Sequence, residues 1–329
     1  MNLLFKMKKT LFLSTVIMTG LLTAAHAQPF VRQVEPFPVT AGSDQIALPF
    51  TGGINSPLHQ FVDIDGDGDL DLFVFDNDLG MDFYRNEGTP LVSRFALRNN
   101  LVSIPGFFIW FRFVDFDGDG RVDLCTEDST FQGVRVFKNI GTTASPEFSE
   151  IIPTLKDTSG ADVYTGGNSI PAFVDIDGDG DFDIISANAS GTVNLYRNVG
   201  TATLPRYAFT SGNWENILIF GDTCTTTLAP VQSPAHGAAA YSFADIDGDG
   251  DYDMFIGDLF SVGVFHIRNA GTPQAAQMQC ATAFFPQNEP VHTGGFNQTS
   301  FVDIDSDGDL DMFIGTLAGI VQRDGFIFY

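Results

Sequence analysis

The chain has 329 residues, of which 41 are Asp or Glu and 16 are Lys or Arg, so its formal net charge is −25. This balance argues against nucleic acid as a partner, because phosphate binding needs clustered Lys and Arg. Since 44% of the residues are hydrophobic and only 17% are charged, the composition also differs from that of a disordered acidic chain. We therefore expect a folded chain, and 34 Gly with 33 Phe favour short strands and tight turns.

The first 27 residues have the three parts of a secretory signal peptide. Three lysines lie within residues 6–9, residues 11–22 form an apolar stretch, and residues 25–27 read Ala-His-Ala, a small-x-small cleavage site. The apolar stretch is too short for a comfortable membrane span, although a retained N-terminal anchor is the alternative. We expect a secreted or cell-surface protein whose mature chain starts at Gln28 and does not insert into a membrane.

A nine-residue acidic pattern recurs five times after this segment, at residues 63–71, 115–123, 175–183, 245–253 and 303–311. Successive copies start between 52 and 70 residues apart, which is typical of a repeated unit of about four short strands. Phe lies two residues before every copy, and a short apolar run follows each one. Four copies also have a later base-Asn pair that leads into a Gly-Thr turn. Each repeat is therefore predicted to contain a strand, an acidic loop and three further strands.

The expected strands are apolar on consecutive positions, so both faces of each sheet must be covered by neighbours. Radial stacking into a β-propeller achieves this. We predict an all-β propeller over residues 28–329, with repeats at about 59–110, 111–170, 171–240, 241–298 and 299–329. The segment 28–58 has no acidic loop and is predicted to supply the outer strand of the last blade. Five loops fit either a five-bladed ring or a truncated seven-bladed propeller.

The acidic pattern places oxygen donors where a hard cation needs them. Calcium takes about six to eight oxygen ligands. Asp stands at positions 1, 3, 5 and 9 of every copy, and Gly at position 6 permits a sharp reversal. Position 7 is expected to ligate through its backbone carbonyl, so Arg121 is tolerated there. An EF-hand is excluded because position 12 is never Glu. About five structural Ca²⁺ ions are predicted, and the metal-site residues are Asp63, Asp65, Asp67, Asp69 and Asp71; Asp115, Asp117, Asp119, Arg121 and Asp123; Asp175, Asp177, Asp179, Asp181 and Asp183; Asp245, Asp247, Asp249, Asp251 and Asp253; and Asp303, Asp305, Asp307, Asp309 and Asp311.

These loops and their flanking strands resemble the FG-GAP/VCBS repeat family and are similar to the calcium-loop blades of integrin α-chain propellers. The resemblance covers about Phe61 to Gly319. It implies that each loop joins the first two strands of a blade and lies remote from the adhesive face. Two departures are visible: relatives often have seven blades, and residues 322–325 fall out of step with the earlier base-Asn segments. We expect a binding or adhesion module for a protein or a glycan, with structural calcium.

Three cysteines remain in this secreted chain. Cys125 falls where other repeats have Phe or Ile, so we expect a buried thiol. Cys224 and Cys280 occupy matching places before the fourth and fifth loops. We predict that these two pair across neighbouring blades.

No recognised catalytic motif occurs in the sequence, and carboxylates that hold calcium are poor general acids or bases. The chain is therefore expected not to be an enzyme. A cluster of His59, His236 and His292 at one propeller face is conceivable, although separate loop residues are favoured. The fold alone also permits an extracellular polysaccharide lyase or hydrolase built on the propeller, or a structural spacer of a larger surface protein. The segment Thr210 to Ala240, which contains Trp214, is where a ligand-binding or catalytic site would be sought first.

Overall fold

The computed structural model describes residues 37–46, 57–76, 80–99, 102–107, 109–227, 237–316 and 327–328. Within these ranges the regular structure is β-strand, apart from the single 3-10 turn η1 (Trp214–Asn216). No helix of the described residues is long and apolar enough to cross a membrane. The predicted signal peptide at 1–27 lies outside these ranges.

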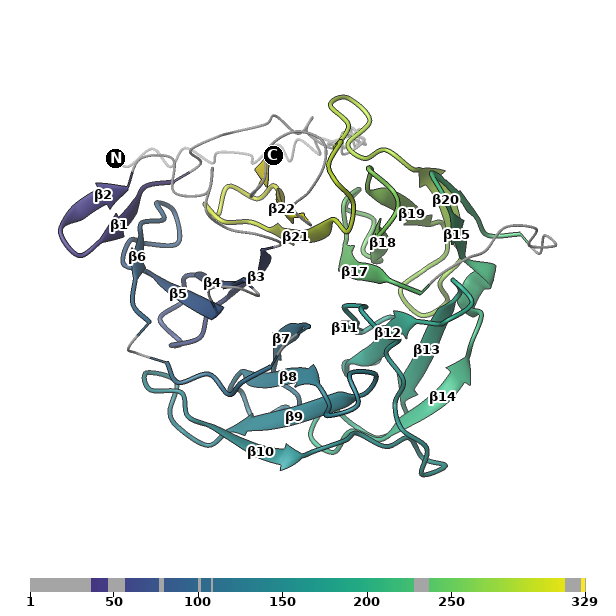
Figure 1. Cartoon of the computed structure of the whole chain (residues 1–329), viewed down its shortest axis with the longest axis horizontal. Helices are drawn as coiled ribbons and strands as arrows, with labels where there is room; N and C mark the ends of the chain where they lie inside the picture. The colour runs from purple at the N-terminus through teal and green to yellow at the C-terminus, as the bar shows by residue number, and fades with distance from the viewer. Residues whose placement is uncertain are drawn as a thin grey trace, which may run out of the picture.

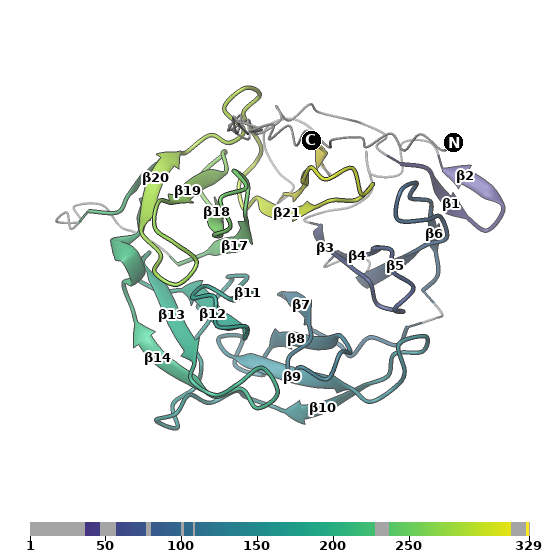
Figure 2. The ribbon, with the colours of Figure 1, turned by 180° about the vertical axis from the view of Figure 1, so that it is seen from behind.

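Five sheets follow one another around a central axis, as the two opposite views in Figure 1 and Figure 2 show. Within each blade the strands are antiparallel and in chain order from the axis outwards, and the sheet of blade 1 continues beyond its fourth strand. Blade 1 contains β3 (Leu58–Val62), β4 (Asp71–Asp76), β5 (Gly80–Asn86) and β6 (Phe95–Leu97); blade 2 contains β7 (Phe111–Val114), β8 (Asp123–Glu127), β9 (Val134–Asn139) and β10 (Phe148–Ile152); blade 3 contains β11 (Ala172–Val174), β12 (Asp183–Ala187), β13 (Val193–Asn198) and β14 (Tyr207–Ser211); blade 4 contains β17 (Ala239–Ala244), β18 (Asp253–Asp258), β19 (Phe265–Asn269) and β20 (Met278–Thr282); blade 5 contains β21 (Gln298–Val302), β22 (Asp311–Gly315) and β23 (Ile327–Phe328). Four blades have the complete four-stranded unit, and the predicted all-β propeller is confirmed.

The second strand of each blade is covered on both faces. Every residue of β4, β8, β12 and β18 is buried. This is the reason for the consecutive apolar residues after each acidic loop, because a radial sheet has a neighbouring blade against each side. The blade cores are therefore continuous with the interfaces between blades.

One aromatic contact recurs at the interfaces between blades. In three of the five blades the Phe two residues before the acidic loop packs on a Phe at position 11 of the preceding repeat, as Phe113 does on Phe73 with ring centroids 4.4 Å apart. Phe61 makes the same contact with Phe313, also at 4.4 Å, although these residues belong to the first and last blades. The amide of Gln298 in blade 5 also pairs with the backbone of His59 in blade 1. The described blades thus form a closed ring of five, which selects the five-bladed ring over the truncated propeller.

The segment before the first loop lies differently from the prediction. Strand β1 (Val39–Ala41) pairs with β2 (Asp44–Ile46) and, in parallel, with β6. The prediction of an outer strand for the last blade is therefore wrong for residues 37–46, which extend blade 1; residues 28–36 lie outside the described ranges. Phe37 still serves the junction of the first and last blades, because its ring contacts both Phe95 and Phe313. The outer edge of β6 has free backbone hydrogen-bonding groups, and no residue pattern in the sequence predicts which segment will pair with them.

An outer hairpin lies between blades 3 and 4, formed by β15 (Leu218–Phe220) and β16 (Thr223–Thr225). The disulfide between Cys224 and Cys280 ties this hairpin to β20, so the predicted pairing is confirmed. Cys125 is a buried free thiol, also as predicted.

Candidate metal centres

Each acidic loop connects the first and second strands of its blade and gathers three carboxylates. In every loop one oxygen from each of three Asp residues lies within 4.8 Å of the other two. The groups are Asp63, Asp65 and Asp67; Asp115, Asp117 and Asp123; Asp175, Asp177 and Asp179; Asp245, Asp247 and Asp249; and Asp303, Asp305 and Asp307. Each predicted loop thus brings three of its ligand candidates together.

The first Asp of each loop holds the turn in shape. The Asp63 carboxylate accepts the backbone N–H groups of Gly66, Asp67 and Gly68 at 2.7, 3.2 and 3.0 Å. The bonds to positions 5 and 6 recur in all four other loops. Gly68 has a φ of +93°, a region that residues with a Cβ rarely adopt. The invariant Gly within the repeats is therefore a requirement of the backbone.

The Asp at position 9 is the most deeply buried ligand candidate. One oxygen of Asp183 accepts the backbone N–H of Asn198 at 2.7 Å, and the other is buried without a hydrogen-bond partner. Asp71 is held by Asn86 in the same way, and its second oxygen is equally unpartnered. Burial, reinforced by the neighbouring carboxylates, raises the pKa of Asp183 to about 7 and that of Asp71 to about 8. A cation at this point would supply the missing partner.

The Asn that ends the third strand, directly after an Arg or Lys in most blades, also shapes the next turn. The side-chain oxygen of Asn198 accepts the N–H groups of Gly200 and Arg206 at 3.0 and 2.8 Å. Its backbone meanwhile donates to Asp183, so one residue connects the metal loop with the turn to the fourth strand. The repeated base-Asn pair was visible in the sequence, but this role was not predicted.

The Arg or Lys that precedes this third-strand Asn orients the Asp carboxylate at position 3 of the loop. Arg85 binds one oxygen of Asp65 at 2.6 Å, and Arg197 forms the equivalent ion pair with Asp177. The second oxygen of each Asp is buried and has no hydrogen-bond partner. The base therefore engages one oxygen and leaves the other available to a cation. Sequence reasoning missed this contribution, although the fixed spacing of base and Asn was its signal.

Position 7 behaves differently from the prediction in three loops. We expected its side chain to be free to vary, yet Asp69, Asp181 and Asp251 are buried and each has one oxygen without a partner. Burial and the adjacent Asp raise the pKa of each of these carboxyl groups to about 6. Their side chains are thus further oxygen donors of the site.

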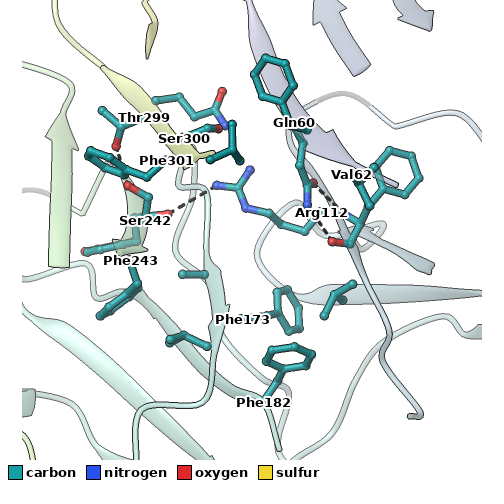
Figure 3. A pocket seen from close by; sticks show the side chains of 18 of the residues that line it. Gln60, Val62, Arg112, Phe173, Phe182, Ser242, Phe243, Thr299, Ser300 and Phe301 are labelled. Atoms are coloured by element: carbon teal, nitrogen blue, oxygen red, sulfur yellow. Dashed lines mark hydrogen bonds between the residues drawn. The ribbon is translucent and has the colours of Figure 1, made fainter. Parts of the chain in front are cut away.

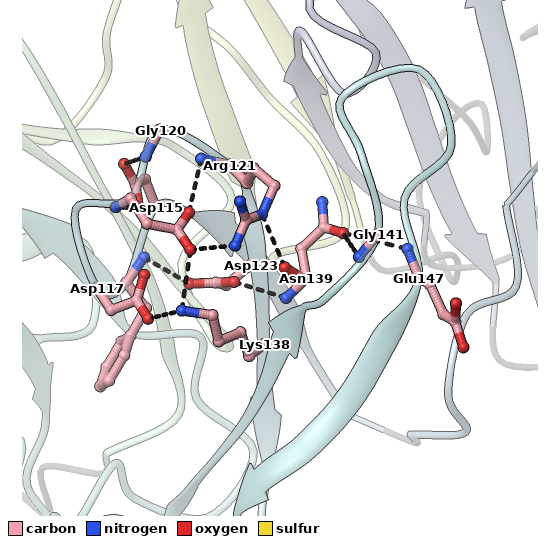
Figure 4. Close-up of polar contacts among 11 residues, drawn as sticks. Asp115, Asp117, Gly120, Arg121, Asp123, Lys138, Asn139, Gly141 and Glu147 are labelled. Atoms are coloured by element: carbon pink, nitrogen blue, oxygen red, sulfur yellow. Dashed lines mark hydrogen bonds and ion pairs between the residues drawn. The ribbon is translucent and has the colours of Figure 1, made fainter.

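The second loop departs from the others, as Figure 4 shows. Arg121 at position 7 donates to the backbone oxygen of Asn139 at 3.0 Å and forms an ion pair with Asp119. Lys138 also pairs with Asp119, at 2.9 Å, and with Asp117. The two bases draw Asp119 away, which explains why the converging group in this loop uses the position-9 Asp instead.

The donor set of these loops consists of carboxylate and backbone oxygens, which suits Ca²⁺ better than softer metals. The buried, unpartnered oxygens of Asp65, Asp71, Asp177 and Asp183 are the strongest indication of fit, because such atoms are costly without a partner. These residues, with the Asp at positions 1 and 5, would hold the ion. A bound divalent cation would offset part of the negative charge of the loop and would link the first two strands of the blade.

The alternative of a histidine cluster, which the sequence did not favour, receives no support. His59 is fully buried between blades, and burial, aided by Arg112, lowers its pKa to about 3. His292 is exposed near Phe284, and His236 lies outside the described residues. No converging group among the described residues contains His. A different histidine, His266, touches a metal loop: its Nε2 is 2.9 Å from Asp253, which the sequence did not signal.

Fold and loops together define a β-propeller in which an acidic loop joins the first two strands of each blade. A sequence-family comparison matches the FG-GAP-like repeat at residues 63–126 and 115–186. These two matches support the resemblance to the FG-GAP/VCBS repeat family that the acidic loops indicated. No curated protein matches the chain in a sequence comparison.

Proposed function

We propose that this protein is a secreted binding or adhesion module for a protein or a glycan, and that Ca²⁺ in its loops is structural. The propeller and the FG-GAP-like repeats support a module of this type. The buried, unpartnered carboxylate oxygens at positions 3 and 9 are the observation that carries the calcium assignment. The signal-like segment 1–27 supports secretion.

Removal of calcium tests the structural assignment. A site kept at 100-fold over its dissociation constant contributes roughly 2.7 kcal/mol to the folded state if the unfolded chain does not bind. We expect a large fall in melting temperature with EDTA and recovery with excess Ca²⁺, measured by calorimetry. Magnesium serves as the control, because it demands near-ideal octahedral geometry and gives up its bound waters reluctantly. A melting curve that EDTA leaves unchanged would rule the assignment out.

The ligand is best sought on the mature protein with a glycan array and a polysaccharide-degradation screen. We expect binding without turnover. Degradation would favour a lyase or hydrolase, and silence in both assays would favour a structural spacer. The segment that we singled out for such a site is less suitable than expected, because Trp214 is only 7% exposed and packs in the core of blades 3 and 4. Phe220 in this segment is 37% exposed, and exposed aromatic rings also lie outside it, at Phe182 and Tyr252.

A further inference from the structure

The axis of the propeller contains a cavity of about 440 Å³. It is lined by the inner strands β3, β7, β11, β17 and β21, and Figure 3 shows its side chains. The volume is within the usual range of small-molecule sites, which is about 300 to 1,000 Å³. Loop residues also line it, among them Asp115 and Asp175, the first Asp of the second and third loops.

One position of the repeat differs from blade to blade at this cavity. The residue three places before each acidic loop lines it in all five blades. These residues are Gln60, Arg112, Ala172, Ser242 and Ser300. The two positions that follow it hold Phe, and Val or Ala, in every copy, whereas the ring position itself differs between blades. Arg112 is the only charged member of this ring.

Arg112 extends across blade 3 towards blade 4. Its Nε donates to the backbone oxygen of Pro171 at 3.1 Å, and its Nη atoms lie 3.2 and 3.5 Å from the oxygens of Phe111 and Tyr241. Ala172, the ring member of blade 3, is too small to obstruct this path. Three of the five guanidinium N–H donors thus have carbonyl partners, and two remain.

Asp115 and Asp175 line the same cavity, but neither they nor any other described carboxylate forms an ion pair with Arg112. Burial lowers the pKa of Arg112 to about 10. Removing a guanidinium from water without a counter-charge is costly, and carbonyl dipoles offset only part of that cost. An anion in the cavity would complete the site. The Ser300 hydroxyl, which also lines the cavity, is a further donor.

Aromatic rings line the cavity beside Arg112. Phe182 and Tyr252 stand at position 8 of the third and fourth loops, where their side chains are 39% and 43% exposed. Phe173 and Phe243 lie on the inner strands below them. Exposed rings of this kind favour a ligand with a flat, apolar body.

We propose that the axial cavity binds a small organic monocarboxylate, with its carboxylate on Arg112 and its apolar body against the aromatic rings. The planar guanidinium fork matches the geometry of a carboxylate. A singly charged ligand is selected because the net charge of −25 and the acidic loops repel polyanions.

Benzoate is a suitable probe, with the calcium-loaded protein and isothermal titration calorimetry. We expect benzoate to bind, and benzamide, which has the same ring without the charge, to bind at least about tenfold more weakly. Arg112→Gln should abolish binding, whereas the matched variant Arg94→Gln, on an exposed arginine away from the cavity, should bind like the wild type. Undiminished benzoate binding by folded R112Q, equal binding of benzamide, or no binding by the wild type would each overturn the proposal.

Arg112 also connects three blades, so R112Q has a risk of misfolding that a second variant avoids. Phe182→Ala removes one exposed ring and touches neither the Arg112 hydrogen bonds nor a predicted metal ligand. We expect this variant to melt close to the wild type and to bind benzoate several-fold more weakly. Unchanged benzoate affinity in F182A would contradict the proposed placement of the apolar body.

Discussion

Replacement of Asp183 by Asn separates the metal-binding role of this residue from its structural role. The Asn side chain has the same shape, and its carbonyl oxygen can still accept the N–H of Asn198. Its amide nitrogen replaces the buried, unpartnered oxygen and cannot ligate calcium. The substitution therefore removes one calcium ligand with little change of packing.

The expected effect changes sign with calcium. In excess Ca²⁺ the D183N variant should lose up to roughly 2.7 kcal/mol of unfolding free energy, the contribution of a site held at 100-fold over its dissociation constant. In EDTA the reverse holds, because burial raises the pKa of Asp183 to about 7. A raised pKa means that the stability contributed by this carboxyl is present at acid pH and is lost as the pH rises to 7, at a cost of about 4 kcal/mol. The neutral Asn avoids that cost.

Urea unfolding of wild type and variant at pH 7, with and without calcium, measures both quantities. The matched control is Asp162→Asn, an exposed carboxylate that pairs with Lys156 outside the loops. We expect no calcium-dependent difference for this control. Equal destabilisation of D183N in calcium and in EDTA would show that Asp183 acts through packing alone and would refute the reasoning.

Three further predictions concern other parts of the molecule. Arg121→Asp removes one of the two bases that bind Asp119, leaving Lys138, and gives the second loop the acidic residue of the others. Calorimetry should therefore detect tighter calcium binding but lower stability in EDTA, and unchanged affinity would contradict the role assigned to Arg121. Burial lowers the pKa of His59 to about 3 in the folded protein, whereas its pKa in the unfolded chain is 6.5. The stability that neutral His59 contributes is therefore fully present above pH 6.5 and falls by about 1.4 kcal/mol per pH unit below pH 6.5. In His59→Gln the free energy of unfolding, measured with urea, should lack this pH dependence. An unaltered pH dependence would argue against the role of His59. The double variant Cys224→Ser, Cys280→Ser opens a link across 56 residues and should cost about 4 kcal/mol, measured against intact protein without reductant; a loss below about 1 kcal/mol would show that the hairpin is held by packing.

The repeated features of the sequence predicted the repeated features of the structure. Five copies of an acidic loop predicted five blades, and the Phe before the loop proved to be a contact between blades, as in Phe61 with Phe313. The position of β1 against β6 was not predictable, because pairing at an open sheet edge uses backbone groups that every residue has. The burial of the Asp69 side chain was also missed. The sequence does not distinguish a position-7 Asp that contributes its side chain from one that contributes only its backbone carbonyl.

The same comparison of repeats indicates where specificity is to be sought. Positions that are identical in all copies have structural roles. The Asp at position 1, such as Asp63, shapes the turn, and the Phe before the loop packs against the neighbouring blade. A position that lines the cavity in every blade but holds different residues does not need one particular residue for the blade to fold. Four of the five blades place an uncharged residue there, and only blade 2 supplies a guanidinium, Arg112. Since a buried charge without a counter-ion destabilises the free protein, its presence at the axis is better explained by what it binds than by what it holds together.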